Sequence, residues 1–418
     1  MAENEETKAY NDHNVYILGA GFSADAGLPL IGSFMNKMRD AVDWLEKQDD
    51  RKREIEAITN VLAFRRRAAS AAYRVNLDLE NIEELFSLAS ASEAKMTQDV
   101  IWAIAATLDF AEKNFESPQC LISTAYAGAQ VPIPDRWKQM PNWDPRSYSC
   151  PAYELYLTIM TGHLTPPREE QRDTFITFNY DLVLEKTLRN LGIPFSYGLS
   201  GEFIDFDKSA EWMKVPDDQA RAHVLKLHGS VNWVSLQGNE RSWATAWTQM
   251  LNEHRTLEDA IRELRPSFTT TIFGDYESVN RAGRTPLLAP PTWQKSFGEP
   301  LLTVWDSAVA ALQTATNVII VGYSMPHTDE HFKYLLAAGL KENISLRKIF
   351  FVNLEADKLK KRLYSVFSRE HLARYVVVPE SVGVGPFLFY PEKRRGINRN
   401  LPGQLEYAQP SYLQDGHL

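Results

Sequence analysis

Runs of consecutive apolar residues alternate along this chain with segments in which apolar residues recur every three or four positions. Apolar runs typical of buried strands lie at 15–18, 317–322 and 348–353, and further strand patterns lie at 173–179 and 223–228. Helical periodicity follows most of them, at 33–46, 181–190, 301–316, from about 329, and at 357–367. Strand alternating with helix predicts an α/β fold of the Rossmann-like, doubly wound kind, with a parallel sheet covered on both faces.

Helical periodicity also fills a long segment after the first predicted strand, at 54–72, 81–89 and 94–112, with few strand signals before a loop at 132–151 that is rich in Pro, Trp and Asp. We therefore expect residues 15–30 and 171–380 to form the sheet core and 31–170 to form a mostly helical insertion. Within the core, 232–286 is predicted to be irregular. Residues 381–418 are predicted to be a C-terminal extension.

Composition places the chain among ordinary globular proteins. It has 418 residues, 44% hydrophobic and 24% charged, so the informative features are local. The formal net charge of −9 disfavours sequence-independent binding to nucleic acid or to an anionic membrane, since such binding depends on Lys and Arg.

Only two cysteines occur, at Cys120 and Cys150, which excludes a disulfide framework and a four-cysteine zinc site. The N-terminal residues lack the basic and apolar regions of a signal peptide, and the longest apolar stretch, 100–108, is too short to span a bilayer. We expect a cytoplasmic protein.

The first predicted strand ends in glycines. Gly19, Gly21 and Ala24 match the G-x-G-x-x-G/A pattern of a strand–turn–helix that binds a dinucleotide phosphate. Glycine lets the backbone approach a pyrophosphate, whose charge then meets the positive end of the next helix. A tight turn without a ligand explains the same glycines, so this pattern alone leaves both interpretations open.

Polar residues follow each of the five predicted strands, and ligands of a doubly wound sheet gather beyond the carboxyl ends of its strands. Each residue alone has a structural explanation, as a helix cap, a turn or a buried histidine. Their recurrence at five strand ends favours a ligand site. The residues concerned are Gly19 to Ser23, Asn179 to Asp181, His228 to Ser230, Gly322 to Ser324 and Asn353 to Glu355.

Several of these segments resemble sirtuins, in the same order along the chain. Residues 19–29 (GAGFSADAGLP) resemble the sirtuin opening, 177–181 (TFNYD) their Thr-Gln-Asn-Ile-Asp, and 227–229 (LHG) their His-Gly. Residues 321–324 (VGYS) are similar to the sirtuin Gly-Thr-Ser turn, and 352–355 (VNLE) to the Ile-Asn-x-Glu that holds adenosine. Bacterial sirtuin-like proteins, many of them antiphage effectors, also contain segments similar to 290–293 (PPTW) and 322–332 (GYSMPHTDEHF).

The departures from sirtuins concern the part of the site that takes acyl-lysine. Sirtuin deacylases place a four-cysteine zinc module after the His-Gly strand, whereas residues 232–286 contain no cysteine. Residues 30–33 (LIGS) also differ from the Asp-Phe-Arg that follows the glycine turn in deacylases.

The resemblance implies an NAD glycohydrolase that uses NAD as its substrate and needs no metal. It implies that Asn179 holds the ribose and positions a water, that Asp181 grips the nicotinamide carboxamide, and that His228 is the general base. A histidine exchanges protons near neutral pH without a large pKa shift. The residues that it assigns to binding the dinucleotide are Gly19, Ala20, Gly21, Ser23, Asp25, Gly322, Ser324, Asn353 and Glu355.

The family also implies a biological setting, the NAD-depleting effector of a bacterial antiphage system. The activity of such enzymes has to be held in check until it is needed. Outside the predicted core, only the helical insertion and a short C-terminal extension remain, which is too little for a large fused sensor domain. We therefore expect a homo-oligomer with a separately encoded partner, such as a HerA-type ATPase or a short Argonaute. An NAD-dependent deacylase and a non-catalytic sensor of NAD or a cyclic derivative are the alternatives. His327 and His331 have the i, i+4 spacing of metal ligands, but no third ligand is apparent, and we expect 326–329 to begin a helix.

Overall fold

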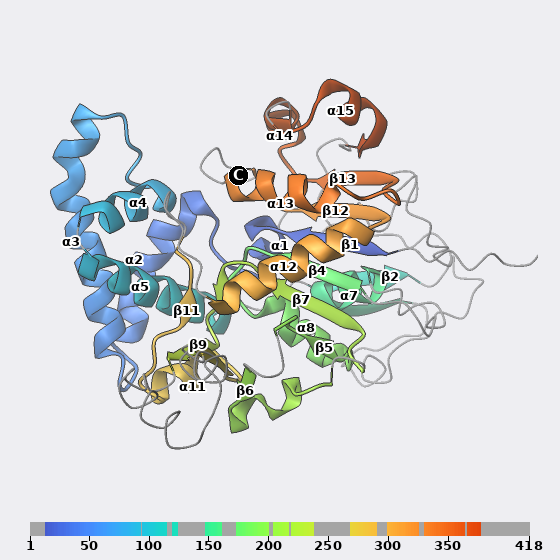
Figure 1. Cartoon of the computed structure of the whole chain (residues 1–418). Helices are drawn as coiled ribbons and strands as arrows, with labels where there is room; N and C mark the ends of the chain where they lie inside the picture. The colour runs from blue at the N-terminus through green and yellow to red at the C-terminus, as the bar shows by residue number, and fades with distance from the viewer. Residues whose placement is uncertain are drawn as a thin grey trace, which may run out of the picture.

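A computed structural model of the protein describes most of the chain (Figure 1). The residues described are 13–92, 94–114, 119–123, 147–160, 173–199, 204–216, 219–237, 268–290, 299–325, 330–363 and 366–377.

The centre of the fold is a seven-stranded parallel sheet with the order β14-β13-β12-β1-β4-β7-β5. Its strands are β1 (Asn14–Leu18), β4 (Asp173–Thr177), β5 (Phe195–Ser196), β7 (Ala222–Lys226), β12 (Asn317–Val321), β13 (Lys348–Val352) and β14 (Val376–Val377). The five strands predicted from the sequence are all present, and the predicted α/β doubly wound class is confirmed. The chain adds strands on one side of β1 and then returns to the other, so the strand order reverses between β1 and β12.

The register brings the carboxyl ends of these strands to one level. Leu18 pairs with both Thr177 and Val321, while Thr177 pairs in turn with Lys226. Val321 pairs with Val352. The polar segments that follow these five strands therefore share one edge of the sheet.

The two outermost strands were not predicted. Both β5 and β14 are two residues long, too short to give an alternating or apolar pattern of their own. Each exists because a longer neighbour, β7 or β13, offers its free backbone groups.

Helices cover the sheet and form a separate group beside it. Figure 1 shows α12 in front of the strands and α2 to α5 grouped to one side. Among the described residues, the helices longer than six residues are α2 (Phe34–Leu45), α3 (Lys52–Arg74), α4 (Ile82–Ser92), α5 (Ala94–Lys113), α7 (Ala152–Met160), α8 (Val183–Leu191), α12 (Glu299–Thr314), α13 (Glu330–Leu340), α14 (Ala356–Leu363) and α15 (Arg369–Tyr375). The shorter helical segments are α1 (Ala20–Ser23), η1 (Ala24–Ala26), η2 (Ile31–Ser33), η4 (Lys208–Met213) and α11 (Tyr276–Arg281). The predicted boundaries of α2 to α5 agree with the structure to within a few residues.

Two segments predicted to be irregular, 232–286 and the loop at 132–151, contain regular elements in the parts that the structure describes. Segment 232–286 contributes β9 (Trp233–Gln237) and β10 (Phe268–Ile272), which join β6 (Ile204–Phe206) in a three-stranded sheet. The pairs β8 (Gly229–Ser230) with β11 (Leu287–Leu288), and β2 (Gln119–Ser123) with β3 (Ser147–Pro151), form two-stranded sheets. These strands pair with segments far from them in the sequence, so the local pattern carried little signal. The predicted C-terminal extension, 381–418, lies outside the described residues.

Within the part of the chain that the structure describes, no helix combines the length and the apolar character needed to cross a membrane.

Candidate functional site

The glycine turn after β1 packs directly on the turn after β12, at the point where the strand order reverses. The N–H of Gly19 donates to Val321 O at 2.9 Å, and the N–H of Gly21 donates to Gly322 O at 2.8 Å. A Cβ on Gly21 would lie 2.8 Å from Gly322 Cα, and one on Gly19 would lie 2.7 Å from Tyr323 Cα. The glycines therefore allow two loops to touch, and these two N–H groups are already used. The expected role of the turn in binding a pyrophosphate remains a prediction.

Gly322 makes the closest of these contacts, and we expect its replacement to destabilise the folded protein. Its φ is +64°, and a Cβ would lie 2.3 Å from the backbone nitrogen of Phe22. We expect Gly322→Ala to lower the free energy of unfolding by about 2–4 kcal/mol, from left-handed strain and from the clash. Gly283→Ala is a matched control, because its φ is +65° but a Cβ would meet nothing within 4 Å. Urea denaturation should show a loss near 1 kcal/mol for the control; equal losses in the two variants would contradict the packing argument.

Three predicted site residues meet in one hydrogen-bonded cluster. Asn179 Nδ2 donates to Gly19 O and to Ser23 Oγ, each at 3.0 Å, and Ser23 Oγ donates to Asp181 Oδ1 at 3.1 Å. Ser23 and Asp181 are buried, while Asn179 is partly exposed. The cluster joins the loop after β1 to the loop after β4. Thr177 joins the same loops, because its hydroxyl donates to Leu18 O and accepts from the N–H of Asn179.

His228 lies beside this cluster, two residues beyond the end of β7. Its ring meets that of Phe178 edge-on, with 5.1 Å between centroids, and lies 6.1 Å from that of Tyr180. These aromatic residues flank Asn179 in the sequence, so the fold brings His228 to the same loop as the predicted ribose-binding residue. The side chain of His228 is buried.

Burial dominates the electrostatics of Asp181. Loss of water around the carboxyl group raises its pKa to about 6, and the nearby charges of Glu112 and Glu185 act in the same direction. Lys226 and the N–H of Val183 oppose this shift. Val183 N–H donates to Asp181 Oδ1 at 3.1 Å at the start of α8. Asp181 therefore changes its protonation state close to neutral pH.

This shift has a consequence for stability. Because the folded-state pKa is about 6 rather than 3.8, the folded protein holds the proton more tightly than the unfolded chain. The contribution of the Asp181 proton to the stability of the folded state is complete below pH 4 and is lost as the pH rises to about 6. Asp181→Asn carries no ionisable group at this position. We expect its free energy of unfolding, relative to that of the unmodified protein, to rise by about 1–3 kcal/mol from pH 4.5 to pH 7.5. Urea denaturation at the two pH values measures this, and a difference that does not change with pH would contradict it.

The other predicted residues belong to the segments that follow β1, β12 and β13, and several have exposed side chains. Asn353 Nδ2 donates to Tyr323 O at 3.1 Å, which ties the loop after β13 to the loop after β12. Ala20, Asp25, Ser324 and Glu355 are exposed. Glu355 forms an ion pair with Lys358, and the carbonyl oxygen of Ser324 accepts from Arg362.

A buried lysine behind the cluster was not predicted. Lys226, with 1% of its side chain exposed, donates to the main-chain oxygen of Asp181 and forms an ion pair with Glu185 Oε1 at 2.9 Å. Tyr197 donates its hydroxyl to the same Glu185 oxygen at 3.3 Å. Lys226 thus fixes the backbone of the Asp181 loop to β7. A lysine within an otherwise apolar strand is a sequence signal for such a pair, because lysine is almost never buried without a partner.

Tyr153, at the start of α7, holds the glycine turn from the other side. Its hydroxyl accepts from the N–H of Ala26 at 3.0 Å and donates to Phe22 O at 2.5 Å. Its ring also packs edge-on against that of Phe22, with 5.4 Å between centroids. Nothing in the local sequence distinguishes this tyrosine.

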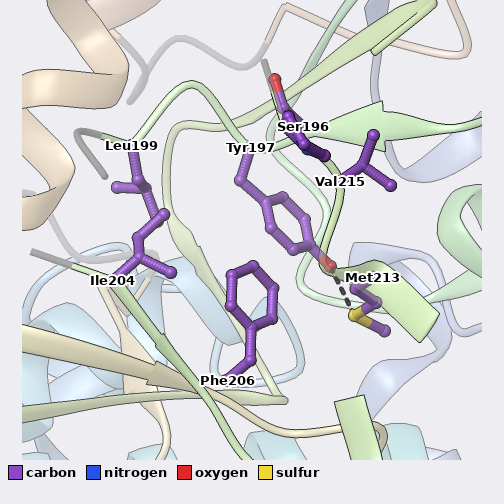
Figure 2. Close-up of a pocket in the computed structure, with 8 residues that line it drawn as sticks. Ser196, Tyr197, Leu199, Ile204, Phe206, Met213 and Val215 are labelled. Carbon is purple, nitrogen blue, oxygen red and sulfur yellow. Dashed lines mark hydrogen bonds between the residues drawn. The ribbon is translucent and has the colours of Figure 1, made fainter. Parts of the chain in front are cut away.

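A small cavity of about 190 Å³ lies near the sheet edge at β5 and is separate from the cluster (Figure 2). It is lined by Ser196, Tyr197, Leu199, Ile204, Phe206, Met213, Val215 and Pro216. None of the predicted site residues lines it. Figure 2 shows the Tyr197 hydroxyl directed to Met213 Sδ, with which it makes a contact of 3.7 Å.

Among the residues that the structure describes, no group of three or more His, Cys, Asp and Glu side chains could hold a metal ion. His331 lies in α13, with its ring 6.1 Å from that of Trp305. His327 and the rest of 326–329 lie outside the described residues, so the expected helix start is described only from Glu330.

Comparison with known proteins links the centre of the site to one family. Residues 173–276 match the family model of the SIR2-like domain, and this stretch contains Asn179, Asp181 and His228. No curated protein matches the chain.

Two solved structures of Sir2 proteins are similar at low identity. One, from work on the mechanism and regulation of Sir2 enzymes, is 13% identical with a TM-score of 0.31, over 92% of each chain. The other, a Sir2 mutant with a p53 peptide and NAD, is 12% identical with a TM-score of 0.30, over 92% of this chain and 94% of that one.

Proposed function

We propose that this protein is an NAD glycohydrolase, which cleaves the bond between nicotinamide and ribose and transfers the ribosyl carbon to water. The observation that supports it most directly is the cluster of Ser23, Asn179 and Asp181. The cluster joins the loops after β1 and β4, next to the strand-order reversal between β1 and β12 where doubly wound sheets bind their ligands. His228 packs on Phe178, the residue before Asn179. Three of these four residues fall within the segment matched by the SIR2-like family model.

The reaction consumes NAD⁺ and water and yields nicotinamide, ADP-ribose and a proton. Cleavage passes through an oxocarbenium-like state, so the enzyme has to hold the ribose and the leaving group while water attacks. Asn179 would hold the ribose and orient the water, and Asp181, as a carboxylate, would accept from the nicotinamide amide. His228 would take the proton from the water. The turns at Gly19–Ser23 and Gly322–Ser324, with Asp25, Asn353 and Glu355, would bind the rest of the dinucleotide.

The alternatives differ in what accepts the ribosyl group. A deacylase would transfer it to the oxygen of an acyl-lysine, in a cleft that sirtuins complete with their zinc module. Segment 232–286 has no cysteine, and its described part forms β9 and β10 of the three-stranded sheet instead. Water is therefore the acceptor that we favour. A sensor would bind the dinucleotide and leave it intact.

Chromatography of NAD incubated with the purified protein tests the proposal. We expect nicotinamide and ADP-ribose in equal amounts, without a requirement for acyl-lysine peptide. O-acyl-ADP-ribose formed only with peptide would identify a deacylase, and tight NAD binding without nicotinamide release would identify a sensor.

The biological role that we propose is depletion of NAD in the bacterial cytoplasm as part of antiphage defence. A homo-oligomer, with a separately encoded partner such as a HerA-type ATPase or a short Argonaute, would restrain it. Light scattering after size exclusion, with NAD assays in the presence and absence of proteins encoded nearby, tests this. A monomer that is fully active alone would contradict it.

A further inference from the structure

The last turn of α5 makes contact with the loop that carries Asp181. The N–H of Leu182, the residue after Asp181, donates to Glu112 Oε1 at 3.1 Å. The other oxygen of Glu112 forms an ion pair with Lys186, one turn further along α8. The Glu112 side chain is only 10% exposed.

Glu112 serves the start of α8 as a capping group from another helix. Leu182 is the N-cap residue of α8, and its own side chain makes no capping hydrogen bond. Free N–H groups and the positive end of the helix dipole both favour a carboxylate there. Asp181 already accepts from Val183 at the same helix start. Two carboxylates therefore share one helix start, one from the predicted site and one from α5.

The neighbouring residues of α5 fix this turn in place. Asp109 pairs with Arg51 of the α2–α3 connection at 2.9 Å, and both side chains are nearly buried. Lys113 pairs with Glu277 of α11 at 2.7 Å, but both side chains are exposed, so this pair adds little to the hold on α5. Because the buried pair of Asp109 holds α5, the position of Glu112 follows that of the α2–α5 helices.

We propose that Glu112 is a positioning residue that couples the α2–α5 helices to Asp181, by holding the start of α8 and by adding negative charge next to the Asp181 carboxyl. The part of this inference that concerns activity rests on the proposed NAD cleavage. The charged groups that act on Asp181 are Lys226 on β7, Glu185 on α8 and Glu112 on α5, and Glu112 is itself paired with Lys186 on α8. His228 follows β7 on the same side of the sheet.

Glu112→Gln separates charge from position, because the amide oxygen can still accept from Leu182. Removing the negative charge lowers the pKa of Asp181. When kcat/KM for NAD cleavage is measured as a function of pH, the acidic limb of the profile should move to lower pH by at least ~0.3 pH unit. Glu112→Ala removes the acceptor as well and should reduce kcat by about tenfold, with a smaller change in KM.

Glu277→Gln is the matched control. It removes the ion pair of Lys113, the next residue on α5, and leaves the contact between α5 and α8 in place. We expect its pH profile and kcat to match those of the unmodified protein. If Glu112→Gln and Glu277→Gln give the same profile, or if Glu112→Ala keeps full kcat, the inference is wrong.

A second measurement does not depend on catalysis. The unfolding free energies of the unmodified protein, Asp181→Asn, Glu112→Gln and the double variant form a cycle, to be measured by urea denaturation at pH 5 and pH 8. We expect a coupling between the two positions that is larger at pH 8, where both carboxyls are charged. Coupling in a protein that leaves NAD intact would refute the proposed function and support the link between Glu112 and Asp181. A pH-independent coupling near zero would refute that link.

Discussion

His228→Ala and Asn179→Ala are each expected to lower the rate of NAD cleavage by about 10²–10⁴-fold, with the fold intact. The first variant removes the proposed base, and the second removes the amide that would orient ribose and water. Both side chains lie beyond the carboxyl ends of strands, and His228 packs against Phe178 and Tyr180 on either side of Asn179. The measurement is nicotinamide release under single-turnover conditions, with circular dichroism to check folding.

The exposed His371 provides a control for the loss of a histidine. His371→Ala should cleave NAD at the unmodified rate. If His228→Ala and Asn179→Ala both retain activity while folded, the assignment of the catalytic residues is wrong even if the protein is an NAD glycohydrolase.

The buried ion pair behind the site should give the largest effect on stability. Lys226→Met keeps the volume of the side chain but leaves Glu185, which is 1% exposed, without its cation. Removing one partner of a buried pair costs about 3–5 kcal/mol. We expect a loss of this size in the free energy of unfolding, measured by urea denaturation at pH 7. Activity should fall too, since Lys226 Nζ also holds the main-chain oxygen of Asp181.

A double variant separates loss of the pair from loss of packing. Lys226→Met combined with Glu185→Leu replaces both charges by apolar groups and should recover most of the stability, since an apolar pair of similar volume is often no worse than a buried ion pair. It should not recover activity, because the contact with Asp181 is still missing. A double variant no more stable than Lys226→Met alone would show that packing, and not the buried charge, sets the cost.

The local sequence was sufficient for the elements that carry a strong pattern. Strands β1, β12 and β13 are nearly uninterrupted apolar runs, as expected for parallel strands covered on both faces. Strands β4 and β7 contain polar residues but keep β-branched or apolar residues at most positions. The helices α2 to α5 show clear three-to-four spacing. The two-residue strands β5 and β14 and the sheet of β6, β9 and β10 depend on partners distant in the sequence, and short patterns do not identify such partners.

The site was predicted in part for the same reason. Residues at strand ends can be found from a sequence, because the ends of parallel strands share one edge of a sheet. Asn179, Asp181 and Ser23 were found in this way, and the structure joins them by hydrogen bonds. Three further residues act on the site from within regular elements and were not found: Lys226 is the last, buried residue of a strand, Glu112 lies at the end of a helix, and Tyr153 lies at the start of another.

The sequence by itself therefore determined the α/β class, the five longer strands of the central sheet and the loops that meet at its edge. These features depend on the apolar and turn-forming character of consecutive residues. The tertiary structure alone decided how the glycines of the first turn are used, which N–H groups they engage, and which charges surround Asp181. Those features depend on contacts between segments such as β1 with β12 and α5 with α8. Such contacts are set by the order of strands and the packing of helices, which no single stretch of the chain contains.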